Sequence, residues 1–184
     1  EMIRDAVLEA SGTLDSKMFG EAVRTEEKKS GEVVPLGETQ GGRRSIYQIV
    51  RRSAPQSFLN AFDAPVMEVN CVRRVTSTSA TQTLALMNGE FIRAQSERFA
   101  KRVLSAETAA GDVEKPGLDR DAVTRAFRIA LARKPTASEL DLQLSFLDAQ
   151  RSRYPDLKPA DRTLRIYADL CQALLSANEF IYID

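Results

Sequence analysis

The sequence predicts a compact, mostly α-helical domain with at most a small two-stranded β ribbon. Apolar residues recur every three to four positions through much of the chain, which is the spacing of helices with one buried face. Residues 79–82 and 136–139 each match the capping box that begins a helix. β-Branched and aromatic residues cluster only in 45–51 and 66–75, and these two predicted strands would pair as the ribbon.

The first predicted helix covers residues 1–11 and ends at Gly12, which can adopt the left-handed conformation of a C-terminal cap. Its predicted apolar face consists of Ile3, Ala6, Val7 and Ala10. Residues 16–42 contain five of the nine glycines and are predicted to form an irregular loop. We expect residues 20–40 to be the most mobile part of the chain, apart from local anchoring by Val33, Val34 and Leu36.

A short helix is predicted after residue 51, with Ser53 as its cap and Pro55 in its first turn. The capping box at 79–82 then begins a helix that stops or bends at Asn88-Gly89. The remaining predicted helices are 90–105, one capped by Asp119 after a linker at 106–117, one from 136 to about 150, and 160–177. The apolar tail formed by Phe180, Ile181 and Tyr182 is predicted to dock on the domain.

Composition excludes several classes of functional site. The 184 residues include no histidine, which removes the commonest general base and metal ligand, and neither Cys71 nor Cys171 belongs to a C-x-x-C pair. We therefore expect no metal site, no cofactor and no catalytic triad. A formal charge of zero argues against nucleic-acid binding, and no apolar run is long enough for membrane insertion. A Cys71–Cys171 disulfide is an option only if the protein is exported.

Adjacent arginines occur at 43–44, 51–52 and 73–74. If they lay on neighbouring strands, their guanidinium groups would form a patch for phosphate, sulfate or carboxylate groups, including those of a sulfated glycan. The simpler interpretation is structural, because neighbours on a strand point to opposite faces, so that one arginine of each pair would form a salt bridge.

One polar cluster is predicted, with a structural role. Asp63 lies before Pro65 at a predicted sharp turn, where we expect a buried or half-buried ion pair with Arg44 or Arg74. Gln82, Asn88 and Glu179 lie at the ends of predicted elements, where they could line a pocket. Caps and local backbone hydrogen bonds are the simpler explanation for them. No residue is assigned a catalytic role.

Several stretches together resemble a known family. They are residues 2–15, 43–47, 62–65, 71–74, 78–88, 132–140 and 169–182, which include Phe62-Asp-Ala-Pro65 and Thr78-Ser-Ala-Thr-Gln82. The chain resembles the C-terminal portion of a domain of unknown function, number 1553, found in large planctomycete proteins. The family's usual upstream helical part, with an Asn-Arg-x-Trp-type motif, does not precede these stretches here, so residues 1–184 would be one domain that forms the C-terminal portion of the family domain.

The resemblance implies an exported, envelope-associated protein in which this domain follows a cytochrome c-like module. It implies no activity and no catalytic residue. The leading hypothesis from the sequence is a non-catalytic structural or interaction module that packs against the other domains of the parent protein. The alternatives are a carboxylate-dependent hydrolase acting on polysaccharide, and an anion-binding or sulfated-glycan-binding module that uses the arginine pairs.

Overall fold

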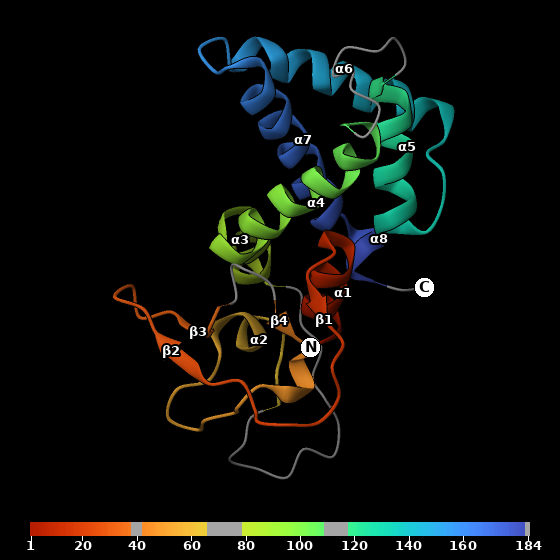
Figure 1. Cartoon of the computed structure of the whole chain (residues 1–184). Coiled ribbons are helices and arrows are strands. Elements are labelled where there is room, and N and C mark those ends of the chain that lie inside the picture. The colour runs from red at the N-terminus through yellow and green to blue at the C-terminus, as the bar shows by residue number, and fades with distance from the viewer. Residues whose placement is uncertain (38–41, 66–78, 109–117, 183–184) are drawn as a thin grey trace.

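The fold is helical, as the sequence predicts (Figure 1). The computed structural model describes residues 1–37, 42–65, 79–108 and 118–182, and this part is 62% helical. Its helices are α1 (Met2–Ser11), α2 (Ser57–Ala61), α3 (Ala80–Asn88), α4 (Glu90–Thr108), α5 (Leu118–Leu131), α6 (Ala137–Arg153), α7 (Pro159–Leu175) and α8 (Asn178–Ile181), with one 3-10 turn, η2, at Ser45–Tyr47. The strands are β1 (Leu14–Asp15), β2 (Thr25–Glu27), β3 (Val33–Pro35) and β4 (Gly42–Arg43).

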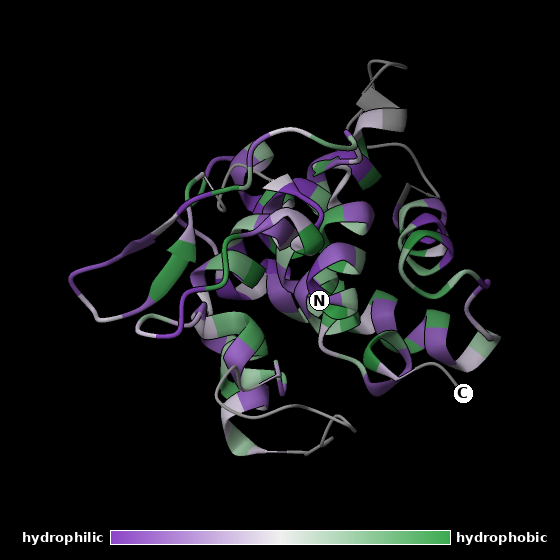
Figure 2. Ribbon diagram, turned by 90° about the horizontal axis from the view of Figure 1, so that it is seen from below, coloured by the Kyte–Doolittle hydropathy of each residue, from purple (hydrophilic) through white to green (hydrophobic). Residues whose placement is uncertain are grey.

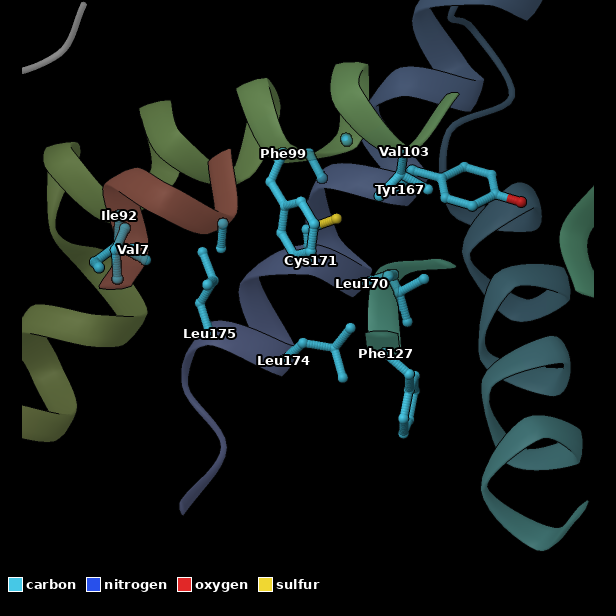
Figure 3. Packing of buried hydrophobic residues seen from close by; sticks show 14 of the residues in the cluster. Val7, Ile92, Phe99, Val103, Phe127, Tyr167, Leu170, Cys171, Leu174 and Leu175 are labelled. Atoms are coloured by element: carbon cyan, nitrogen blue, oxygen red, sulfur yellow. The ribbon is translucent and has the colours of Figure 1, made fainter. Parts of the chain in front are cut away.

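The core lies where α4 and α7 pack against each other, with α1 beside α4 and α5 and α6 beside α7 (Figure 1). Phe99 and Val103 of α4 and Leu170 and Cys171 of α7 are fully buried in one cluster, and Val7 of α1 joins it (Figure 3). Burying each large apolar side chain contributes about 1.5–3 kcal/mol, so this cluster is the main stabilising element of the fold.

The helices are amphipathic rather than uniformly apolar. Figure 2 shows hydrophilic and hydrophobic residues alternating along them. Arg162 and Arg165 on α7, for example, share a helix with the buried Ile166 and Leu170. Within the described residues, no helix combines the length and the hydropathy that a membrane span requires.

Both predicted capping boxes are present. Ser79 Oγ accepts the Gln82 N–H at 3.4 Å, while Gln82 Oε1 accepts the Ser79 N–H at 3.4 Å. Thr136 and Glu139 make the same exchange at the start of α6, at 3.3 and 2.7 Å. The predicted stop at residue 89 is confirmed too, because α3 ends at Asn88 and α4 begins at Glu90. A side chain at Gly89 would bring its Cβ within 2.3 Å of the Ala85 carbonyl oxygen, so the bend requires glycine.

The segment 16–42 contains more regular structure than predicted. Strands β2 and β3 pair antiparallel, with Glu26 opposite Val34, and β1 pairs in parallel with β4. The predicted anchors Val33 and Val34 are buried, whereas Leu36 is 51% exposed. Burial of Val33 and Val34 in β3 favours a β hairpin here instead of an irregular loop.

The predicted strand at 45–51 is wrong. Ser45–Tyr47 forms the 3-10 turn η2, and an isolated bridge pairs Gln48 with Val23. Ile46 and Val50 are 73% and 60% exposed, so their β-branched side chains do not mark a buried strand. The reason is tertiary: Ser45 is held by a carboxylate of α1, as described below. The partner strand predicted at 66–75 lies outside the described residues.

Smaller corrections concern caps and buried faces. Gln56, not Ser53, caps α2, because its Oε1 accepts the Leu59 N–H at 2.8 Å. Asp119 lies inside the first turn of α5 rather than before it, and it accepts a hydrogen bond from Tyr167 at 2.7 Å. Ala6 is exposed, because the buried face of α1 is shifted by one position. Of the C-terminal tail, Phe180 and Ile181 pack on the core, as predicted, while Tyr182 is 49% exposed.

Candidate functional site

A hollow of about 390 Å³ lies between the start of the chain, the segment after η2, and α2. We call it the amide cleft. Its described lining residues are Glu1, Gln48, Ile49, Val50, Arg51, Arg52, Pro55, Gln56, Leu59, Asn60, Ala64 and Pro65. Apolar walls with a few polar groups and a volume in this range are typical of binding sites for ligands.

One wall of the cleft is held by a buried arginine. Arg4 of α1 is 1% exposed, and the Gln48 amide, assigned with its oxygen toward Arg4, accepts from both Nη atoms at 2.9 Å and from Nε at 3.1 Å. Arg4 Nη1 also donates to the Arg43 carbonyl oxygen at 3.0 Å and to Ser45 Oγ at 3.4 Å. Five hydrogen bonds from one guanidinium group therefore attach the segment 43–48 to α1.

Asp5 completes this arrangement. Its Oδ1 accepts the Ser45 N–H at 2.8 Å and the Ser45 hydroxyl at 2.7 Å, and it lies 3.7 Å from Arg4 Nη1. We call Arg4, Asp5, Ser45 and Gln48 the arginine node. A buried charge is tolerated when it is paired and hydrogen-bonded, and the node meets both conditions. Space is tight, since a Cβ at Gly42 would lie 3.1 Å from Arg4 Nη2.

The opposite side of the cleft comes from α2 and the chain before it. Gln56 is buried and occupied in capping α2, whereas Asn60, one turn further along, is exposed. Arg51 and Arg52 are exposed at the rim, and within the described residues their side chains and that of Asn60 form no hydrogen bond or ion pair. These three side chains are the polar groups that the cleft offers to a ligand.

The structure brings two of the predicted site residues together. Asp63 is half-buried and accepts a hydrogen bond from Gln82 Nε2 at 3.4 Å. The predicted sharp turn is present, because Asp63 has a φ of 55° and the Ala64 N–H donates to the Leu59 carbonyl at 3.0 Å. The turn thus ends α2, and the Asp63–Gln82 hydrogen bond links it to the first turn of α3.

The other predicted residues lie apart from that pair. Arg44 is exposed, with its Nε 3.9 Å from Asp5 Oδ2, because η2 carries it to α1 and not toward Asp63. Asn88 is exposed at the end of α3, and Glu179 of α8 forms an ion pair with Arg133 at 2.6 Å. Arg74, the second predicted partner of Asp63, lies outside the described residues, so that contact stays a prediction.

Within the described residues, Arg43 and Arg44 make separate contacts, and Arg51 and Arg52 lie at the rim of the amide cleft. Arg43 donates to the backbone carbonyls of Lys17, Phe19 and Glu21 at 2.6–3.0 Å, and its guanidinium lies 4.1 Å from the Tyr47 ring centre. Arg43 therefore supports the loop before β2, and Arg44 lies next to the arginine node, near Asp5. The pair at 73–74 lies outside the described residues.

Sequence reasoning missed the arginine node, although one signal was present. Arg4 falls on a helical stripe with Val7, Leu8 and Ser11, and a charged residue in an apolar stripe is typical of a buried, paired group. Its partner Gln48 carried no such signal, because nothing in the local sequence connects it to a residue 44 positions earlier.

Cys171, one of the two cysteines, is buried in α7. It is a free thiol in the core, and burial raises its pKa far above the ordinary value. Cys71 lies outside the described residues.

Most of the chain matches one protein family. The family described as "PSD1: Protein of unknown function (DUF1553)" matches residues 1–147. The chain belongs to this family. No curated protein and no solved structure matches it.

The matched DUF1553 region contains the whole amide cleft and the arginine node. It ends within α6, so α7 and α8 lie beyond it although they complete the core. In this DUF1553 chain the region up to residue 147 therefore packs on a C-terminal helix that the match does not include. The family's description names no activity.

An ion cluster joins the end of α5 to α6 and α8. Arg133 binds the Glu179 carboxylate through Nε and Nη2 at 2.6 and 2.7 Å, and the Glu139 carboxylate through Nη1 and Nη2 at 2.9 and 2.7 Å. Hydrogen bonds from Arg133, followed by those from Thr136, lower the pKa of Glu139 from 4.5 to about 2. Arg133 also lowers the pKa of Glu179.

Acid is expected to weaken this cluster. The Glu139 carboxylate has a pKa of about 2 when folded, below its ordinary 4.5, so its stabilising contribution is complete above about pH 4.5 and is lost as the pH falls through 2. Glu139→Gln should therefore unfold at a lower temperature than the wild type at about pH 6, with a gap that closes toward about pH 2.

Glutamine retains the capping geometry, as Gln82 does in α3, so the variant isolates the charge. Thermal unfolding followed by circular dichroism at a series of pH values measures the gap. Asp156→Asn, an exposed change of the same charge in the turn after α6, is the control and should show a smaller gap throughout. A gap for Glu139→Gln that is independent of pH would contradict the assignment.

Proposed function

We propose that this domain is a non-catalytic interaction module of a larger exported protein, and that the amide cleft binds an extended acidic peptide segment from another domain. The observation that carries the proposal is a preformed apolar cleft with two exposed, unengaged guanidinium groups at its rim, counted within the described residues. The resemblance in the sequence makes a cytochrome c-like module the first partner to test.

The walls of the cleft suit a peptide in an extended conformation. Leu59 and Ile49 provide apolar surface for alternate side chains, and Val50 at the edge is 60% exposed. The Asn60 amide carries both a donor and an acceptor, the pair that a peptide backbone unit needs. Such a cleft gains affinity by burying apolar side chains and gains orientation from the amide.

Charge selects the kind of peptide. Arg51 and Arg52 add two positive charges to the rim, and a guanidinium group binds a carboxylate through two parallel hydrogen bonds. Glu1, also in the lining, sets the opposite charge at the start of the chain. A segment with acidic residues at one end therefore has a defined direction in the cleft.

The cleft is rigid before a partner arrives. Arg4 holds Gln48 with three hydrogen bonds, and Gln56 caps α2 on the other side. Because both walls are ordered in advance, binding loses little conformational entropy in the protein.

The hydrolase alternative requires two carboxyl groups facing each other across a cleft. Among the described residues that line the amide cleft, Glu1 supplies one. The cleft therefore supports peptide recognition better than glycoside hydrolysis.

The test uses three synthetic peptides of equal length in which valine alternates with glutamate, serine or lysine. Titration into the ¹⁵N-labelled chain should shift the Asn60 side-chain amide signals most strongly with the glutamate peptide. Charge reversal by Arg51→Glu with Arg52→Glu should weaken that binding by about tenfold or more.

Arg93→Glu with Arg153→Glu reverses two exposed charges elsewhere and serves as the matched control. The control should bind the glutamate peptide as the wild type does. Equal shifts with all three peptides, shifts confined to another surface, or release of reducing sugar from polysaccharide by the purified chain would each contradict the proposal.

A further inference from the structure

A second hollow, of about 560 Å³, lies between α5 and the start of α6. We call it the cation pocket. Arg120, Arg125 and Arg128 of α5 and Lys134 of the α5–α6 turn contribute four positive charges, and Asp121 contributes one negative charge. This concentration contrasts with a chain whose formal charge is zero.

Three of the four cations have no ion-pair partner among the described residues. Within the described residues, the exposed side chains of Arg120, Arg128 and Lys134 form no hydrogen bond or ion pair. Arg125 differs, because it donates to the Val103 carbonyl oxygen of α4. Gathering like charges in one hollow is unfavourable unless a counter-charge is supplied, and here the described chain supplies one carboxylate.

Three other arginines, in the α5–α6 turn and on α6 and α7, are paired. Arg133 binds two carboxylates, Arg151 binds Asp119 at 2.6 Å, and Arg165 lies 3.3 Å from Asp169. The cation pocket differs from these sites because it gathers several cations beside one carboxylate.

The cationic side chains project from ordered elements, α5 and the α5–α6 turn. Arg120 and Arg128 are eight residues apart on α5, so they lie on nearly the same face, two turns from each other. The turn that carries Lys134 is fixed on both sides, because Ala132 adopts a φ of 54° and Arg133 is clamped between Glu139 and Glu179. Binding of a ligand therefore costs little conformational entropy in the protein.

We propose that the cation pocket binds a small polyanion that carries two or more phosphate or sulfate groups. Guanidinium forks match the oxygens of such groups, and a lysine ammonium adds a compact charge. Three unpaired cations on two elements suit several anionic groups better than one, and the hollow has room for a ligand larger than a single oxyanion.

Nucleic acid is the competing polyanion. It is bound along stripes of basic residues that follow its backbone, and the strength of binding follows the overall charge. The cation pocket is a bounded hollow on a neutral chain, which favours a compact ligand.

Isothermal titration calorimetry at low salt tests the proposal with inositol hexakisphosphate, sucrose octasulfate and a single-stranded 20-mer DNA. Arg120→Gln, Arg128→Gln and Lys134→Gln are combined in one triple variant, whose fold is checked by circular dichroism since all three residues are exposed. The triple variant should bind inositol hexakisphosphate, sucrose octasulfate or both about ten- to a hundredfold more weakly than the wild type does.

The matched control combines Arg93→Gln, Lys101→Gln and Arg153→Gln, three exposed cations outside the pocket, and should change affinity by less than about twofold. If the triple variant loses affinity for inositol hexakisphosphate alone, the ligand is phosphorylated. If it loses affinity for sucrose octasulfate alone, the ligand is sulfated. Equal losses in both triple variants, no heat with either small probe, or tighter binding of the DNA would overturn the proposal.

Discussion

Replacing Arg4 with methionine is expected to lower the free energy of unfolding by about 3–5 kcal/mol, because it removes one partner of a buried, hydrogen-bonded charge pair. The side chain of Arg4 is 1% exposed and contacts Gln48, Ser45, Asp5 and the Arg43 carbonyl. Methionine fills much of the space but leaves these acceptors without their donor, and unpaired buried polar groups carry the full cost of desolvation.

Urea unfolding followed by circular dichroism measures this loss. The control is Arg44→Met, the same substitution in the same network, at a side chain that is 53% exposed and 3.9 Å from Asp5. An exposed pair contributes under about 1 kcal/mol, so the two variants should differ severalfold. Similar losses would show that the node does not act as a buried anchor.

The Arg4 variant also tests how the cleft is built. Hydrogen exchange at residues 45–52 should become faster than in the wild type, while exchange in α4 and α7 should follow the change in global stability. Unchanged exchange at 45–52 would mean that contacts other than the node hold that wall of the amide cleft.

Phe99→Ala is expected to destabilise the protein by about 3–5 kcal/mol through lost burial and the cavity that remains. Phe99 of α4 is 0% exposed and lies next to Cys171 of α7 (Figure 3). It lies where α4 and α7, the two helices with the most extensive mutual packing, meet. Neighbouring helices cannot close the space fully, because Val103 and Leu170 are themselves fixed in the same cluster.

Phe19→Ala is the matched control, because Phe19 is 75% exposed. Its backbone N–H and carbonyl, which contact Tyr47 and Arg43, are unaffected by the substitution. The control should lie within about 0.5 kcal/mol of the wild type in urea unfolding. A loss for Phe99→Ala as small as that of the control would show that α4 and α7 do not form the stabilising centre of the fold.

The cleft and the pocket lie on different parts of the chain, so the two proposals can fail independently. The amide cleft depends on the N-terminal elements and the node, whereas the cation pocket depends on α5 and the start of α6. Both fall within the region that matches the DUF1553 family. The charge variants designed for one site leave the lining residues of the other unchanged.

The sequence by itself determined the helices and several of their ends. Each capping box is an exchange between residues three positions apart, and each amphipathic stripe repeats within two turns, so these signals are readable in a short window. Helices α3 and α6 begin where their boxes predict. The fully buried Phe99 and Val103 of α4 and Leu170 of α7 lie on stripes of this kind. The Asp63 turn was also readable, from its position before Pro65.

Only the tertiary structure decided which polar side chains meet. Ser45 takes its conformation from Asp5, 40 residues earlier, and this contact replaces the strand that local β propensity predicts. Gln48 reaches Arg4, and Arg44 reaches Asp5 instead of Asp63, because α1 packs beside η2. A hydrogen bond between residues so far apart forms only after burial has placed their helices and turns, and burial is a property of the whole fold rather than of any short segment.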